Sequence, residues 1–373
     1  MRITLNGLIR LTVATGLALF SLCALIGQAG RRDREWPSEF AAHFPASAFV
    51  HVNAPGEPVS KFLDVRDGSE FRLGLEPGER LDAASCSPWE DQAGRRLLVG
   101  RYTAIEVESG EAIGQEFGMA LYRIPDGKSL ARIKTDLLPV APPCWYPDAT
   151  ARVLFAAGDG LLHQFDFVDA EERDDEAATK PRAIAWDWSE LWPFPPIVSG
   201  PYWPALSGFE RTLIVSLNAR PEEKADYGPS QIWWLRLDAA GDRVVAAGRL
   251  TTPVGGREGP RLDEQRAVLE QGPGGELLLL YQVRREDDAS WELRVAPVEI
   301  GTGFDGPRAG VGHVIDQDKR VGNHALTADG TAVFTILRCW GKATEVRKVP
   351  LTPRWLARGL AFPDCLSDSF GPL

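Results

Sequence analysis

Residues 324–330 read His-Ala-Leu-Thr-Ala-Asp-Gly, and the apolar run Thr331–Leu337 follows them directly. The Asp-Gly step favours a tight turn, because Asp and Gly accept backbone angles that most residues avoid. Within the run, apolar and polar residues alternate at or near every second position in Val333-Phe334-Thr335-Ile336, which is typical of a half-buried strand. The stretch therefore predicts two antiparallel strands joined by a turn.

The same arrangement recurs along the chain. A short strand with a turn rich in Pro, Asp or Gly precedes an apolar run at four other places, which are Ala84–Trp89, Cys144–Asp148, Tyr202–Leu206 and Leu269–Gly275. The turn residues Pro88, Pro147, Pro204, Gly272 and Asp329 lie 59, 57, 68 and 57 residues apart. That period has room for four antiparallel strands and one or two long loops, so we predict a repeated four-stranded unit.

A four-stranded meander cannot bury both of its faces alone, so its copies must stack. Radial stacking leaves only short sheet edges exposed. We therefore predict an all-β protein, a β-propeller of four-stranded antiparallel blades over residues 47–362. Five units begin near residues 82, 141, 202, 266 and 323, and residues 48–75 supply two or three further strands. Six blades are favoured, five or seven stay open, and a linear stack or a β-sandwich pair is the alternative architecture.

The repeat resembles the broad WD40 and TolB-like class of β-propellers, in which a Ser-Pro-Asp-Gly-like turn joins the innermost strand to the second. Ser87-Pro88, Pro147-Asp148 and Ala328-Asp329-Gly330 match that turn in part. Arg66-Asp67-Gly68 and Pro125-Asp126-Gly127 are shortened versions of the turn between the third and fourth strands. The Gly-His and Trp-Asp pairs of WD40 blades are missing in register. The resemblance implies a propeller and no particular activity.

Composition excludes several classes of protein. Of the 373 residues, 44% are apolar and 25% are charged, which fits neither a disordered chain nor a multi-pass membrane protein. The net charge of −11 argues against a nucleic-acid partner, because phosphate backbones are bound by clustered Lys and Arg. The 37 Gly and 28 Pro leave little uninterrupted chain for long helices, and Arg261–Leu269 is the one segment where we consider a short helix.

Residues 1–30 have the pattern of a targeting segment, with Arg2 and Arg10 as the only charged residues. A cleaved signal peptide fits, because Gly27-Gln28-Ala29 places small residues where a signal peptidase requires them. A single membrane anchor fits equally, because twenty uncharged residues span a bilayer core of ~30 Å. We predict an extracytoplasmic protein that contacts a membrane only through this segment, with residues 31–46 as a linker and 363–373 as a C-terminal tail.

The cysteines Cys23, Cys86, Cys144, Cys339 and Cys365 contain no Cys-x-x-Cys pair, so they indicate no zinc or redox centre. In an oxidising compartment the last four can form disulfides, and a bridge between Cys339 and Cys365 would tie the C-terminal tail to a strand. The alternative is that these side chains are buried as small apolar groups. We predict neither a metal site nor a cofactor.

The chain carries no motif of a nucleophilic hydrolase, a zinc protease or a P-loop protein. Acids on or near the predicted innermost strands are candidates for acid–base chemistry, since propeller glycosidases use two carboxyls roughly 5–9.5 Å apart. These acids are Asp82, Glu90, Asp148, Glu210, Glu264, Glu270 and Asp329. The sequence alone does not select a pair among them.

The most unusual stretch is Trp186–Pro196, which holds three of the 12 tryptophans and continues to an aromatic pair. Aromatic rings beside prolines stack on sugars or receive a proline-rich peptide. The alternative is that these rings fill the wedges between adjacent blades. The candidate ligand- or partner-binding residues are Trp186, Trp188, Trp192, Tyr202 and Trp203.

These observations predict an exported, non-catalytic propeller that acts as a binding or scaffold module at the cell envelope, with a protein or a carbohydrate as its partner. The alternative is a propeller hydrolase or lyase acting on carbohydrate, with carboxylates in the channel and the aromatics between Trp186 and Trp203 as a platform for sugar. The fold by itself does not choose between these functions. The sequence does not indicate an oligomeric state.

Overall fold

The computed structural model describes residues 40–43, 49–52, 59–64, 70–75, 79–87, 89–91, 95–108, 111–146, 151–167, 180–204, 206, 209, 211–219, 228–251, 262–272, 274–285, 290–300, 306–318, 321–327, 330–339, 342–351 and 368–370. All regular secondary structure in these residues is β-strand. The predicted leader over residues 1–30 lies outside them, so both of its alternatives stay predictions. No helix long and apolar enough to cross a membrane occurs in the part of the chain that the structure describes.

Within these residues, five antiparallel sheets have at least four strands each. Blade I contains β5 (Glu79–Cys86), β7 (Arg96–Glu108), β8 (Glu111–Ile124) and β9 (Lys128–Lys134). Blade II contains β10 (Cys144–Trp145), β11 (Arg152–Ala156), β12 (Leu162–Asp166) and β13 (Arg182–Ala183). Blade III contains β14 (Ile197–Tyr202), β15 (Thr212–Asn218), β16 (Gln231–Leu237) and β17 (Val244–Arg249).

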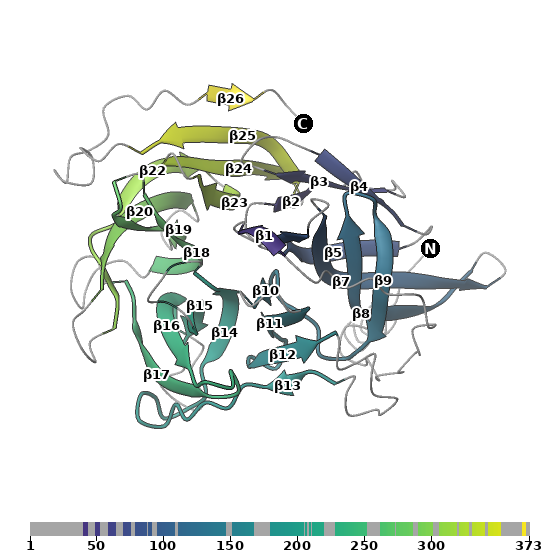
Figure 1. The fold of residues 1–373 in the computed structure, drawn as a ribbon, viewed down its shortest axis with the longest axis horizontal. Helices are drawn as coiled ribbons and strands as arrows, with labels where there is room; N and C mark the ends of the chain where they lie inside the picture. The colour runs from purple at the N-terminus through teal and green to yellow at the C-terminus, as the bar shows by residue number, and fades with distance from the viewer. Residues whose placement is uncertain are drawn as a thin grey trace, which may run out of the picture.

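The other two blades complete the ring. Blade IV contains β18 (Leu262–Gln271), β19 (Leu277–Arg285), β20 (Trp291–Glu299), β21 (Arg308–Ala309) and β22 (His313–Asp318). Blade V contains β23 (Val321–Leu326), β24 (Thr331–Cys339), β25 (Lys342–Pro350) and β26 (Asp368–Phe370). Figure 1 shows the sheets arranged radially around a centre. The chain is therefore an all-β, five-bladed propeller, as the repeat predicts, and the innermost strands begin within five residues of the predicted starts.

A smaller sheet of β2 (Phe49–Val52), β3 (Val59–Asp64) and β4 (Glu70–Gly74) lies between blades V and I (Figure 1). The complete blades therefore number five, one of the counts that the sequence leaves open, rather than the favoured six. The reason is that the C-terminal strand β26 pairs with β25. It completes blade V and leaves β2, β3 and β4 as a three-stranded sheet.

Two short strands occur in segments expected to be a linker and a tail. Within residues 31–46, β1 (Phe40–His43) pairs with β6 (Trp89–Asp91) near the centre of the ring (Figure 1). Within residues 363–373, β26 forms the outer strand of blade V. The short helix considered over Arg261–Leu269 is wrong, because residues 262–269 belong to strand β18, which pairs with β19.

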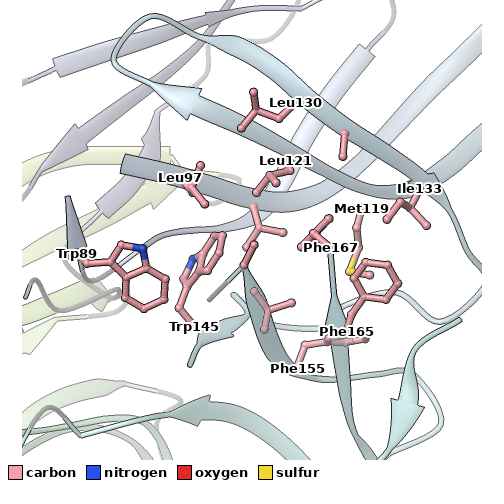
Figure 2. Close-up of a cluster of buried hydrophobic side chains, with 14 of the residues drawn as sticks. Trp89, Leu97, Met119, Leu121, Leu130, Ile133, Trp145, Phe155, Phe165 and Phe167 are labelled. Carbon is pink, nitrogen blue, oxygen red and sulfur yellow. The ribbon is translucent and has the colours of Figure 1, made fainter. Parts of the chain in front are cut away.

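Apolar clusters fill the spaces between neighbouring blades. Figure 2 shows the cluster between blades I and II, where Leu97, Met119 and Leu121 of one blade meet Phe155 and Phe165 of the next. The rings of Trp89 and Trp145 pack edge-on with centroids 5.7 Å apart. The Trp145 indole also donates a 3.2 Å hydrogen bond to the Ser85 carbonyl oxygen of blade I. Each fully buried aromatic side chain of this kind contributes roughly 1.5–3 kcal/mol by leaving water.

One glycine in blade I is required by close packing. Gly118 in β8 lies directly opposite Tyr102 in β7, and a Cβ at Gly118 would lie 2.7 Å from the Tyr102 ring and would clash with the Ile133 carbonyl oxygen. The open space lets the Tyr102 hydroxyl donate a 2.8 Å hydrogen bond to Glu116.

We expect Gly118→Ala to destabilise the protein by about 1–3 kcal/mol, because overpacking against backbone cannot relax easily. Thermal melting of the purified variant measures this. Gly74→Ala is the matched control, because a Cβ at Gly74 meets nothing within 4 Å. Equal melting temperatures for the two variants would contradict the prediction.

Candidate functional site

The segment between β13 and β14 joins blade II to the outer strand of blade III. Ala185 forms a parallel bridge with Arg243, in which Val244 N donates to the Ala185 carbonyl at 2.8 Å and Ala185 N donates to the Asp242 carbonyl at 2.9 Å. Gln164 in β12 adds a side-chain link by donating a 2.5 Å hydrogen bond to the Asp242 carboxylate. The start of the tryptophan-rich segment is thus fixed across two blades.

Local hydrogen bonds then shape the segment that carries the tryptophans. The Asp187 carboxylate accepts hydrogen bonds from the backbone N and the hydroxyl of Ser189, at 3.1 and 2.6 Å, and these bonds lower the pKa of Asp187. The Trp188 carbonyl oxygen accepts from Leu191 N at 2.8 Å and Trp192 N at 3.0 Å. These two hydrogen bonds close a tight turn between Trp188 and Trp192.

A small pocket of about 20 Å³, partly open to solvent, lies beside this segment, between blades II and III. Its lining is apolar and consists of Leu161, Leu162, Ile184, Trp186, Trp188, Pro196, Val198 and Val244. Four residues that lie next to or near lining residues in the sequence have exposed polar side chains. They are Asp187, Ser189, Glu190 and Arg243. Nearby, Leu191 and Val245 are 44% and 56% exposed. The pocket therefore combines aromatic and aliphatic walls with hydrogen-bonding groups beside them.

The three predicted tryptophans of the segment lie together. Trp186 and Trp188 line the pocket, and Trp192 packs edge-on against Trp186 with ring centroids 5.9 Å apart. Trp192 also packs against Trp233 of β16 at 4.8 Å. All of these side chains are half-buried. Part of each ring therefore packs against other side chains, and part is exposed to solvent.

The structure places Tyr202 and Trp203 away from the rim surface. Each is 7% exposed, and Trp203 lies in the buried core between blades II and III, where it packs against Tyr146 at 5.1 Å. The Tyr202 hydroxyl donates a hydrogen bond to Glu270 of blade IV, and burial raises the pKa of Tyr202 well above its ordinary value. The five predicted residues thus form an outer group of three and an inner pair.

Sequence reasoning did not identify Trp233 as part of this aromatic group. A usable signal was present, because Trp233 and Trp234 are consecutive in a strand and must point to opposite faces of the sheet. Trp234 packs toward blade IV, and Trp233 packs with the cluster shared by blades II and III.

Among the predicted acids, Glu264 has the most distinctive surroundings. It is 4% exposed, accepts a hydrogen bond from the Thr251 hydroxyl, and lies 3.8 Å from Nη2 of Arg249. Burial raises the pKa of Glu264 despite these contacts. Asp148, Glu210 and Asp329 lie outside the described residues, as do the side chains of Asp82 and Glu90.

A second carboxyl, which the sequence did not single out, lies on the same face of blade IV. Val283 in β19 pairs with Glu264 on one side and with Glu292 in β20 on the other, so the two glutamates face the same way with one strand between them. Nε and Nη2 of Arg294 donate to the Glu292 carboxylate at 2.8 and 2.5 Å. The face therefore carries one acid with a raised pKa and one carboxylate bound to an arginine.

Cys86 and Cys144 are both buried, and burial raises the pKa of Cys144 to about 12. Cys365 lies outside the described residues, so the bridge between Cys339 and Cys365 stays a prediction. Among the described residues, no group of three His, Cys, Asp or Glu side chains is arranged to hold a metal ion.

We expect Glu264→Gln to change how stability depends on pH. A carboxyl whose pKa is raised in the folded protein contributes stability that is complete below its ordinary pKa of 4.5 and is lost as the pH rises through the raised value. Glutamine keeps the acceptor for Thr251 and cannot ionise. The variant should therefore gain in melting temperature relative to the wild-type protein as the pH rises from 4.5 toward neutrality.

Thermal melting over a pH series checks this expectation, with Glu299→Gln as the control because Glu299 is exposed at the end of β20. Parallel profiles for the wild-type protein and Glu264→Gln would contradict it.

No protein-family model matches the chain, and no curated protein matches it. Among solved structures, the chain is similar to NanB plus Optactamide, with 8% identity and a TM-score of 0.44 over 88% of this chain and 67% of that one. It is also similar to an ulvan lyase of the polysaccharide lyase family PL25, with 9% identity and a TM-score of 0.41 over 84% of this chain and 82% of that one.

A third similar structure is the GH43 protein BlXynB from Bacillus licheniformis, with 13% identity and a TM-score of 0.30 over 80% of this chain. The chain spans less than two thirds of the BlXynB structures that it matches, 64% and 63% of their lengths. Likenesses this distant carry no argument about the site. The chain is a β-propeller on its own topology, and the finer resemblance to WD40 and TolB-like propellers stays a prediction.

Proposed function

We propose that the protein binds carbohydrate at the rim pocket. The observation that carries the proposal is the pair of half-buried indole rings, Trp186 and Trp188, that line a small apolar pocket open to solvent between blades II and III. The CH-rich face of a pyranose ring packs on an indole ring, while its hydroxyl groups require polar partners at the edge. Here Asp187 and Arg243 are exposed next to the pocket-lining residues and supply an acceptor and a donor for neighbouring hydroxyl groups.

A proline-rich peptide is the alternative occupant, because such peptides also dock in aromatic-lined grooves. The exposed charged residues Asp187 and Arg243 favour a ligand with many hydroxyl groups over an apolar one. If the predicted export takes place, the ligand is a glycan outside the cytoplasm, and the protein is a binding module at the envelope.

We expect Trp188→Ala to weaken glycan binding at least tenfold, a loss of about 1.4 kcal/mol. Binding of a panel of neutral polysaccharides is measured by affinity electrophoresis and then by isothermal titration with oligosaccharides of the best ligand. Trp291→Ala is the matched control, because Trp291 is also half-buried but lies in blade IV. Binding that Trp188→Ala leaves intact, or capture of proline-rich peptides without any glycan, would contradict the proposal.

Glycan cleavage at a separate place, between blades III and IV, is the second candidate function, and it is favoured by Glu264 and Glu292 on one face of blade IV. Strands two positions apart are separated by roughly 10 Å, which leaves the carboxyl groups close to the range of roughly 5–9.5 Å that glycosidases use. In this function Glu264, whose pKa is raised by burial, donates a proton to the leaving oxygen. Glu292, bound by Arg294, takes the proton from the attacking water.

We expect Glu264→Gln and Glu292→Gln each to lower the release of reducing ends about 100-fold or more, the usual contribution of a positioned acid or base. Glu299→Gln, exposed on the same strand as Glu292, is the control. An unsaturated product would instead indicate a lyase. If the wild-type protein binds a glycan and releases no product, cleavage is excluded for that glycan and the non-catalytic binding function stands.

A further inference from the structure

The innermost strands of four blades share a β-bulge. In each of β5, β14, β18 and β23, two residues of the strand lie opposite one residue of the next strand, which defines such a bulge. The bulges fall between Asp82 and Ser85, Ser199 and Tyr202, Gln265 and Val268, and Val321 and His324. They therefore recur around the ring, each in an innermost strand. Bulges change the direction of a side chain and are frequent next to functional sites.

The first residue of the bulge has a left-handed backbone in three of these blades. The angle φ is 46° at Ala83, 56° at Gly200 and 51° at Arg266. Glycine adopts this conformation at no steric cost, whereas a residue with a Cβ is strained in it. Blade III has the glycine, and blade IV has an arginine. Because backbone strain of this kind is concentrated at functional sites, Arg266 is a candidate functional residue.

Arg266 lies in the innermost strand of blade IV, β18 (Figure 1). The two residues that follow it face the neighbouring blades, since Ala267 packs in the cluster shared with blade III and Val268 in the cluster shared with blade V. Arg266 belongs to neither cluster, and its side chain is exposed. Burial of its charge nevertheless lowers the pKa of Arg266. A side chain that is open to solvent and still desolvated indicates a recess in the protein rather than a convex surface.

A guanidinium group in a recess is suited to bind an oxyanion. Its planar fork of N–H groups matches the oxygens of a carboxylate, a sulfate or a phosphate, which accept two parallel hydrogen bonds. The group has five N–H donors, so it can donate to a protein acceptor and to an anion at once. Its attraction to an anion is also stronger in a recess than in bulk water, because the surrounding protein lowers the effective dielectric constant.

We propose that Arg266 binds an oxyanion group of a ligand at the centre of the ring. The ligand carries a carboxylate, a sulfate or a phosphate group. The site is separate from the pocket between blades II and III and goes beyond the proposed carbohydrate binding. Since Gly200 forms the equivalent bulge in blade III, the bulge itself does not require an arginine.

The test measures oxyanion binding to the full chain. Sulfate, phosphate and acetate are titrated separately by calorimetry, at an ionic strength held constant with potassium chloride. We expect saturable binding of at least one of the three, with a rise in melting temperature at saturation. Arg266→Gly should weaken that binding about tenfold or more, as expected for the loss of a hydrogen bond to a charged group. Arg266→Lys, which keeps the charge, should retain part of the affinity.

Two control variants separate the backbone and the charge from the site. Ala83→Gly relieves the same left-handed backbone in blade I without changing the charge. Arg182→Gly removes one positive charge from the exposed outer strand of blade II. Both should bind the oxyanion as tightly as the wild-type protein. Arg266→Gly should melt no lower than the wild-type protein, because glycine adopts this backbone without strain.

Three results would overturn the inference. They are the absence of saturable binding for all three anions, an equal affinity in Arg266→Gly, and a clear loss of melting temperature in Arg266→Gly, which would make the arginine a structural residue. Trp188→Ala should leave oxyanion binding intact, and Arg266→Gly should leave the binding of neutral glycans intact. Failure of this inference is therefore distinguishable from failure of the proposed function.

Discussion

Each blade of this protein has two apolar faces, and only a neighbouring sheet covers each of them. In β11, Leu154 packs toward blade III while the next residue, Phe155, packs toward blade I. In β12, Leu162 and Phe165 divide in the same way. Because a strand places successive side chains on opposite faces, no blade can bury its apolar residues without two neighbours. This requirement makes the ring the stable arrangement and fixes where a site can form.

Neighbouring blades of a ring diverge from the centre outward. The space between two blades is therefore a wedge, and larger side chains are required to fill its outer part. Between blades II and III, Trp203 is buried in the cluster that Trp186 and Trp192 cover from outside. The pocket is bounded by Trp186 and Trp188 and reaches Val198 of β14. Packing and ligand binding are therefore compatible roles for one set of aromatics.

The sequence predicts strands and their order better than it predicts contacts between blades. Repeated turns located the innermost strands to within a few residues, because turn chemistry is local. The blade count depends on where β26 pairs, and that pairing joins residues distant from one another in sequence. Trp186, Trp188 and Trp192 were visible as an unusual cluster, whereas the bulge that contains Arg266 depends on strand register. Glu292 was missed for the same reason, since only the ladder through Val283 aligns it with Glu264.

The bridge between Ala185 and Arg243 joins blade II to blade III beside the pocket. In the proposed function, a ligand in the pocket contacts Leu162 of blade II and Val244 of blade III. By mass action, a ligand that binds only when the two blades are in contact stabilises that contact by RT ln(1 + [L]/Kd). Binding at the proposed site therefore also raises the stability of the ring.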